Sequence, residues 1–280
     1  MSPQWYPGHM ASAMRAIREN TRLVDVVIEV VDARAPRISR DPGISRISSK
    51  PRVIALAKAD LADPIATQQW IEQFKSEGTP AYPVDARSGE GVADLLRGCR
   101  LLFGERARQP ASGGGGRPMR VMVVGVPNVG KSSLINRMTS GASARTGAMP
   151  GVTRGKQWVR TMEGIEVLDL PGVLRPGRIA GSESFKLALL GIIPETAYDP
   201  SDVMVRAIQY FSAGHDERHD GILAWIRAGE KGSPEEALLT IGKRKGFLKK
   251  GGEIDVFRTA AWVINQVREG KAGRLSLETP

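Results

Sequence analysis

The stretch Gly125-Val126-Pro127-Asn128-Val129-Gly130-Lys131-Ser132 matches the pattern G-x-x-x-x-G-K-[ST]. It follows the apolar run 121–124, which predicts a buried strand, and it precedes residues that predict a helix beginning at Lys131. In that setting backbone N–H groups can surround a β-phosphate, Lys131 can reach the β- and γ-phosphates, and the Ser132 hydroxyl can bind Mg²⁺. The alternative is a glycine-rich turn without a ligand, but the flanking strand and helix favour a phosphate loop. The residues expected to line this site are Asn128, Val129, Gly130, Lys131, Ser132 and Ser133.

Two segments downstream can supply further groups to the same site. Asp169-Leu170-Pro171-Gly172 closes a predicted strand, so the Asp169 carboxylate can hold Mg²⁺ through water and the Gly172 N–H can approach the γ-phosphate. Thr153 lies between the phosphate loop and this motif, and its hydroxyl can complete the Mg²⁺ shell. A lone D-x-x-G occurs often by chance, but its spacing behind a phosphate loop makes it informative.

A third motif points to the nucleotide base. Ala57-Lys58-Ala59-Asp60 follows the predicted strand 52–56 and resembles the GTPase sequence N-K-x-D. The Asp60 carboxylate would accept hydrogen bonds from guanine N1–H and the 2-amino group, which adenine cannot offer in that arrangement, while the Lys58 stem covers the base. Asp85-Ala86 resembles the next base-contacting loop, in which an alanine N–H donates to guanine O6.

The base motif also departs from the usual pattern. Ala57 stands where asparagine is expected. That asparagine commonly ties the base loop to the phosphate loop, so its absence puts nucleotide affinity in question without removing the guanine preference of Asp60. For the motif taken alone, the alternative is a strand end with a solvated Lys and Asp.

The order of the motifs is base motif, phosphate loop and then Mg²⁺ motif, whereas in Ras-like proteins the base motif comes last. Alternating predicted strands and helices indicate an α/β fold with a doubly wound, mainly parallel sheet. Such a sheet tolerates circular permutation when its ends lie close together. The Gly-rich stretch 109–118 has the composition of a flexible linker, which would join the former termini. We therefore expect a circularly permuted P-loop GTPase domain over residues 1–178.

Beyond residue 178, helix signals replace strand signals. Asp199-Pro200 and Ser233-Pro234 each place a capping residue before a proline that suits the first helical position. Ser233 and Glu236 have the spacing of a capping box. Residues 179–280 are therefore predicted to form a small all-helical domain.

The charge of the chain favours a polyanionic partner. The 40 Lys and Arg against 30 Asp and Glu leave a formal charge of +10, and the pI is near 10.0. This suits nucleic acid or an anionic membrane. Lys243-Arg244-Lys245 with Lys249-Lys250 is expected to contact rRNA, with a solvated charged face as the alternative.

Other composition features bear on where the protein works. No run approaches the ~18 apolar residues of a membrane span, and the start of the chain shows no targeting pattern. The single cysteine, Cys99, permits no internal disulfide and has the setting of a buried apolar residue. We expect a soluble cytoplasmic protein that does not bind membranes.

Taken together, these features resemble the bacterial ribosome biogenesis GTPase A family over essentially the whole chain. The permuted motif order and the phosphate loop 125–133 carry the resemblance jointly with three other segments. These are Gln4-Trp5-Tyr6-Pro7-Gly8-His9-Met10, Val31-Asp32-Ala33-Arg34-Ala35-Pro36 and Gly273-Arg274-Leu275-Ser276-Leu277-Glu278. The resemblance implies late assembly of the large ribosomal subunit, with GTP or GDP, the subunit precursor and rRNA as partners. It also implies stimulation by the ribosomal particle. Asn128 matches the phosphate-loop asparagine with which potassium-stimulated GTPases hold K⁺ near the phosphates, so we expect K⁺ there. We expect a monomer off the ribosome.

Hydrolysis also requires a group that positions water. The residue after D-x-x-G, a glutamine in Ras-like proteins, is Val173, which has no polar side-chain atom. His9 is the candidate, because a neutral imidazole can accept a hydrogen bond from water and Pro7-Gly8 would let it move. The family resemblance assigns this histidine a catalytic role, and the alternative is a loop or capping histidine.

Two other functions remain open at this point. One is a GTP-dependent RNA- or membrane-associated regulatory protein with weak intrinsic hydrolysis. The other is a guanine-nucleotide-dependent binding module with negligible turnover, which Ala57 and Val173 leave open.

Overall fold

The computed structural model describes residues 15–41, 43–44, 49–107, 117–139, 158–161, 163–169, 181–213 and 233–280. The chain divides into two compact units. The first holds the described residues of 15–60 and 64–169 together with Glu278–Pro280, and the second holds those of 181–277 together with Leu61–Asp63. The predicted boundary lies near residue 178, and the two short exchanged segments are not part of that prediction.

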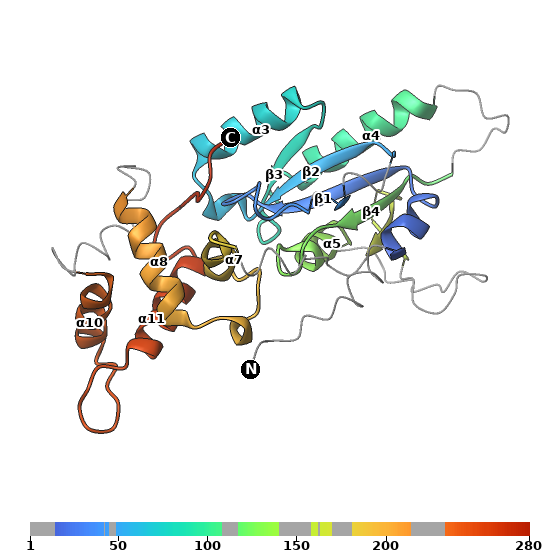
Figure 1. Cartoon of the computed structure of the whole chain (residues 1–280). Helices are drawn as coiled ribbons and strands as arrows, with labels where there is room; N and C mark the ends of the chain where they lie inside the picture. The colour runs from blue at the N-terminus through green and yellow to red at the C-terminus, as the bar shows by residue number, and fades with distance from the viewer. Residues whose placement is uncertain are drawn as a thin grey trace. The chain divides into compact units, whose positions relative to one another are not determined.

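The first unit is built on a six-stranded sheet with the order β3-β2-β1-β4-β6-β5 (Figure 1). Neighbouring strands are parallel except for β5 against β6. Residues of the central strand are buried at every position, as expected where helices cover both faces of a parallel sheet. The predicted fold class is therefore confirmed. The strands are β1 (Val26–Asp32), β2 (Arg52–Ala57), β3 (Ala81–Val84), β4 (Arg120–Val124), β5 (Trp158–Arg160) and β6 (Glu166–Asp169).

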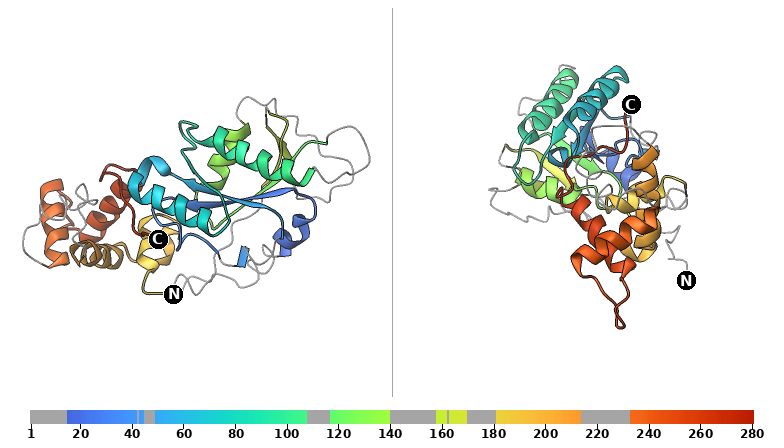
Figure 2. Two further views of the ribbon diagram at one scale, coloured as in Figure 1. Left: turned by 90° about the horizontal axis from the view of Figure 1, so that it is seen from above. Right: turned by 90° about the vertical axis from the view of Figure 1, so that its left-hand side faces the viewer.

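Helices lie on both faces of this sheet (Figure 2). On one face α4 (Val92–Ala107) and α5 (Lys131–Thr139) contact each other and the central strands. On the other lie α3 (Pro64–Ser76) and the helical residues 15–21. Cys99 of α4 is fully buried, as predicted, and burial raises the pKa of its thiol to about 12.

The sheet order brings the two predicted nucleotide motifs to one edge. The phosphate loop follows β4 and the base motif follows β2, and these strands lie on either side of β1. Because parallel strands end at the same edge, the loops after β1, β2 and β4 meet there, although about 70 residues separate base loop and phosphate loop along the chain.

The described part of the second unit is helical: α7 (Ser184–Leu189), the 3₁₀ turn η2 (Glu195–Ala197), α8 (Pro200–Ala213), α10 (Pro234–Lys245) and α11 (Val256–Arg268). The predicted capping box is present at α10. Ser233 Oγ accepts from the Glu236 N–H at 3.3 Å, and the Ser233 N–H donates to Glu236 Oε2 at 3.0 Å. No helix among the described residues is long and apolar enough to cross a membrane.

The C-terminal tail makes contacts within each unit in turn. In the second unit the Leu275 N–H donates to the Leu61 carbonyl at 3.0 Å, and the Asp63 N–H donates to Ser276 Oγ at 3.2 Å. In the first unit Glu278 is 5% exposed. Its Oε2 accepts from the backbone N–H groups of residues 37 and 38 at 2.8 and 3.2 Å. The end of the chain thereby anchors the loop that follows β1.

Candidate nucleotide site

The phosphate loop requires glycine and left-handed backbone at defined positions. A Cβ added to Gly125 would lie 2.4 Å from the Val30 carbonyl oxygen, so the loop can leave β4 this close to β1 only with glycine there. Asn128 and Gly130 have φ of 59° and 111°. These turns lead directly into α5, whose N-terminus carries the partial positive charge that attracts phosphate.

The side chains at the start of α5 have the distribution that a phosphate site needs. Lys131 is 8% exposed, and its Nζ donates to the Val126 carbonyl at 2.9 Å, which keeps the ammonium inside the loop. Ser132 and Ser133 are exposed on the first turn. Val129 is fully buried and fixes the loop on the core. A buried cation and an exposed hydroxyl therefore stand side by side at a helix N-terminus.

The base loop lies against the phosphate loop. Lys58 has φ of 59°, and its Nζ donates to the Asn128 carbonyl at 3.2 Å. Ala57 is 3% exposed, and its Cβ lies 3.7 Å from the position of a Cβ built on Gly130. Although Ala57 offers no polar side-chain atom, the two loops are joined through Lys58.

Asp60 lies in the 3₁₀ turn η1 (Ala59–Leu61) and is partly exposed. Within the described part of the chain, its carboxylate makes no hydrogen bond or ion pair. Its oxygens therefore have their acceptor capacity available for a ligand.

The second base-contacting loop is pinned to α5. Asp85 accepts from the backbone N–H groups of Arg87 at 2.7 Å and Ser88 at 3.1 Å. Burial acts to raise the pKa of its carboxyl, but hydrogen bonds from the Ser88 side chain and from these two N–H groups outweigh it and hold that pKa below the usual value. Arg137 Nε donates to the Ala86 carbonyl at 2.9 Å. The Ala86 N–H has no hydrogen-bond partner among the described residues, so the loop is fixed by its carbonyl and offers its N–H.

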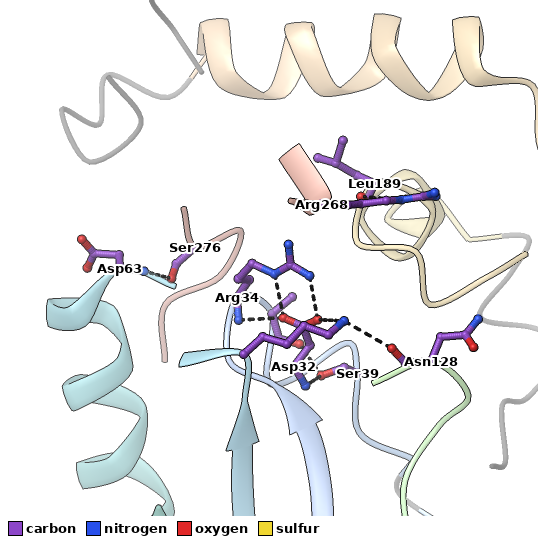
Figure 3. A network of polar contacts seen from close by, with 10 residues as sticks. Asp32, Arg34, Ser39, Asp63, Asn128, Leu189, Arg268 and Ser276 are labelled. Carbon is purple, nitrogen blue, oxygen red and sulfur yellow. Dashed lines mark hydrogen bonds and ion pairs between the residues drawn. The ribbon is translucent and has the colours of Figure 1, made fainter. Parts of the chain in front are cut away.

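A buried ion-pair network adjoins both loops (Figure 3). Asp32, at the end of β1, accepts from Arg34 Nε and Nη2 at 2.9 Å each and from Lys58 Nζ at 3.0 Å. The Asp32 and Arg34 side chains are 0% and 1% exposed. Burial alone would raise the pKa of Asp32, but the charges of Arg34 and Lys58 outweigh it and hold that pKa well below the usual range.

The structure describes only part of the predicted site. It brings together Lys58, Asn128 and the start of α5, and it places Ala86 beside α5. Asp169 is the last residue of β6, and only its backbone is described. His9, Thr153 and Gly172 lie outside the described residues.

Asp32 and Arg34 have no role predicted from the sequence, where they stand within the family-like segment 31–36. The available signal was an acidic residue at the end of an apolar run with an arginine two residues on. That pattern fits an exposed turn as well as a buried pair, so it did not identify the network.

A basic and aromatic surface lies on the second unit. The side chains of Lys245 and Arg258 cover aromatic rings: Lys245 Nζ lies 4.6 Å from the centroid of Trp262, and Arg258 Cζ lies 4.7 Å from that of Phe247. We call the following five exposed residues the α10 basic cluster: Lys243, Arg244, Lys245, Lys249 and Lys250. Cations beside aromatic rings are typical of surfaces that bind nucleic acid.

Comparisons with known proteins extend over the whole chain. Residues 120–243 match the family model described as 50S ribosome-binding GTPase. The chain is 38% identical to Ribosome biogenesis GTPase A of Priestia megaterium, over 100% of this chain and 98% of that protein. It is 40% identical to Ribosome biogenesis GTPase A of Bacillus cereus, over 99% and 94% respectively.

Solved structures show the same fold. GNP-bound YlqF from T. maritima is 31% identical, with a TM-score of 0.68, and the match covers 96% of this chain and 98% of that one. GDP-bound YlqF gives 31% identity and a TM-score of 0.70 over 95% and 99%.

Proposed function

The chain belongs to the ribosome biogenesis GTPase A family and is a GTPase, and from that premise we propose that it acts in assembly of the large ribosomal subunit. In this proposal it binds a precursor particle with GTP and leaves after hydrolysis. The observation that carries the nucleotide site is the hydrogen bond of Lys58 to the Asn128 carbonyl, which joins the base loop to the phosphate loop.

Guanine is selected by three groups at the end of β2 and β3. The Asp60 carboxylate accepts from N1–H and the 2-amino group, the Ala86 N–H donates to O6, and the Lys58 stem covers the base face. Asp85 holds the Ala86 loop through its bonds to the backbone N–H groups of Arg87 and Ser88, and Ala59 would line the site between Lys58 and Asp60. The available acceptor on Asp60 and the available donor at Ala86 support this assignment, because a guanine edge presents the complementary pattern.

The phosphates rest on the N-terminus of α5. Lys131 contacts the β- and γ-phosphates, and Gly130, Val129 and the following serines offer backbone N–H groups. The exposed Ser132 hydroxyl is a hard oxygen donor that suits Mg²⁺, and Thr153 and Asp169 would complete the shell, with Gly172 at the γ-phosphate. Mg²⁺ so held neutralises charge on the phosphates. Asn128 would hold K⁺ there, where its charge substitutes for that of an arginine finger.

Attack by water requires a positioning group that Val173 cannot provide. His9 takes this part when contact with the ribosomal particle moves the N-terminal segment so that the imidazole reaches the attacking water, because a neutral imidazole can accept a hydrogen bond from that water. The free protein is then a slow GTPase, monomeric in the cytoplasm, and the particle is its activator. The α10 basic cluster would contact rRNA, since each Lys or Arg there can neutralise a phosphate.

Turnover of GTP tests this function when it is measured without subunits, with purified large ribosomal subunits and with purified small subunits. We expect stimulation by the large subunit and none by the small subunit at equal concentration. Equal turnover under all three conditions would contradict the assembly role while leaving the GTPase assignment intact.

A further inference from the structure

Asp32 occupies the point where the sheet connects the two nucleotide loops. It ends β1 and pairs in register with Ala57, the last residue of β2. On its other side β1 pairs with β4, the strand that enters the phosphate loop. Its side chain is fully buried. A buried carboxylate needs a cation or hydrogen-bond donors beside it, so the partners of Asp32 indicate what its charge is used for.

Those partners exceed what a structural ion pair requires. Arg34 alone neutralises the carboxylate and engages both oxygens, with Nε on Oδ1 and Nη2 on Oδ2. The Arg34 N–H also donates to Oδ1 at 3.1 Å. Even so, Oδ2 accepts a further bond from Lys58 Nζ at 3.0 Å. This second cation comes from the base loop, and its side chain remains 27% exposed.

Lys58 is held in a conformation that it would not adopt freely. Its φ of 59° lies in the left-handed region that disfavours residues with a Cβ. The Asn128 carbonyl, which accepts the other hydrogen bond of the Lys58 ammonium, belongs to a residue with the same φ. Two left-handed non-glycine residues, one in each nucleotide loop, are thus connected, and Asp32 fixes the ammonium that connects them.

From these contacts, we propose that Asp32 is a positioning residue for guanine-nucleotide binding, which holds Lys58 so that it ties the base loop to the phosphate loop. This connection through Lys58 compensates for Ala57, because the asparagine that commonly occupies that position joins the base loop to the phosphate loop. Arg34 sets the orientation of the Asp32 carboxylate. This inference rests on the proposed base site, because Lys58 matters to the ligand only if the nucleotide binds there.

A double-mutant cycle tests the proposal on the full chain, with release of a fluorescent GDP analogue as the measurement. Asp32→Asn removes the charge, and Lys58→Met removes the ammonium but keeps the stem. Each change should speed release about tenfold, or about 1.4 kcal/mol. The double variant should release no faster than either single variant, since both changes break one interaction. An unchanged rate in Asp32→Asn, or a roughly hundredfold additive effect in the double variant, would overturn the proposal.

Two further variants separate positioning from folding. Asp32→Asn leaves the buried Arg34 with a weaker partner, so Asp32→Leu with Arg34→Met replaces the pair by apolar residues of similar volume, an exchange that is often tolerated. This variant should keep the unfolding midpoint near that of the wild type and still release GDP about tenfold faster. The matched control is Asp25→Asn. Asp25 lies immediately before β1, and its Oδ1 is paired with Arg117 Nη2 at 2.6 Å. This variant should release GDP at the wild-type rate. Release at the wild-type rate from the apolar pair, or faster release from the control, would count against Asp32 as a positioning residue.

Failure of this inference differs from failure of the base site. If Asp60→Asn changes base preference but the cycle shows no coupling, only the part played by Asp32 is lost. If Asp60→Asn has no effect on base preference, the base site itself is wrong.

Discussion

At the scale of single residues, side-chain contacts stabilise strained backbone conformations in the two nucleotide loops. Lys58 and Asn128 each have φ of 59°, a conformation that costs on the order of 1–3 kcal/mol in a non-glycine residue. The ion pair of Lys58 with Asp32 and its hydrogen bond to Asn128 offset that cost. Such strain persists only where neighbouring groups impose it, and here it falls in the two loops that the motifs assign to the nucleotide.

Asp60 should determine the choice of base. In Asp60→Asn, an amide donor replaces one carboxylate acceptor, which suits the 2-oxo group of xanthine and opposes the 2-amino group of guanine. We expect GTP affinity to fall about 100-fold and XTP affinity to rise, because hydrogen bonds to a charged group contribute about 1.5–3 kcal/mol. Competition binding measures the affinities for GTP and XTP. The control is Asp94→Asn, which changes an exposed carboxylate on α4. Unchanged GTP affinity would remove Asp60 from the base site.

His9 should affect chemistry without affecting binding. His9→Ala is expected to leave the affinities for GTP and for the large subunit nearly unchanged and to lower stimulated turnover by about 10²–10⁴-fold, the usual effect of one acid–base or positioning group. Single-turnover hydrolysis on the particle measures this directly. A wild-type rate in the variant would make His9 a structural residue and assign water positioning to the particle.

At the scale of helices and strands, local patterns were sufficient for much of the fold. The apolar runs at 52–56 and 121–124 predicted β2 and β4, because strands covered on both faces are largely apolar. The capping box of α10 was predicted from Ser233 and Glu236, whose two hydrogen bonds are local. The ion-pair network of Asp32 was not predicted, because one of its partners, Lys58, comes from the loop that follows β2.

The α10 basic cluster should govern the salt dependence of particle binding. Replacing Lys243, Arg244, Lys245, Lys249 and Lys250 by Ala should flatten the plot of log affinity against log salt, since each neutralised phosphate contributes roughly 0.7–0.9 to the slope. GTP affinity should not change, because the cluster and the nucleotide loops belong to different units. Subunit binding titrated at several salt concentrations gives the slope. A slope equal to that of the wild type would place the rRNA contact elsewhere.

At the scale of the whole molecule, the chain exchanges short segments between its two units. Leu61–Asp63 follow the base loop directly yet belong to the helical unit, and Glu278–Pro280 end the helical unit yet belong to the sheet unit. No local pattern could predict this, because the bond between the Arg37 N–H and Glu278 spans 241 residues. The Glu278 carboxylate and carbonyl accept from three donors that lie on the loop after β1 and on α3.

Removal of this terminal anchor should destabilise the sheet unit. Deletion of residues 278–280 would leave the N–H groups of Arg37 and Ile38 and the Trp70 indole N–H without their acceptor, and a buried donor that loses its partner costs about 1–3 kcal/mol. Deletion of only residues 279–280 keeps Glu278 and is the matched control. Urea unfolding should therefore give a lower midpoint for the longer deletion and a nearly unchanged midpoint for the shorter one. The loop that Glu278 holds begins immediately after Asp32, so the longer deletion should also speed GDP release. Equal midpoints for the two deletions would show that the stability of the sheet unit does not depend on Glu278.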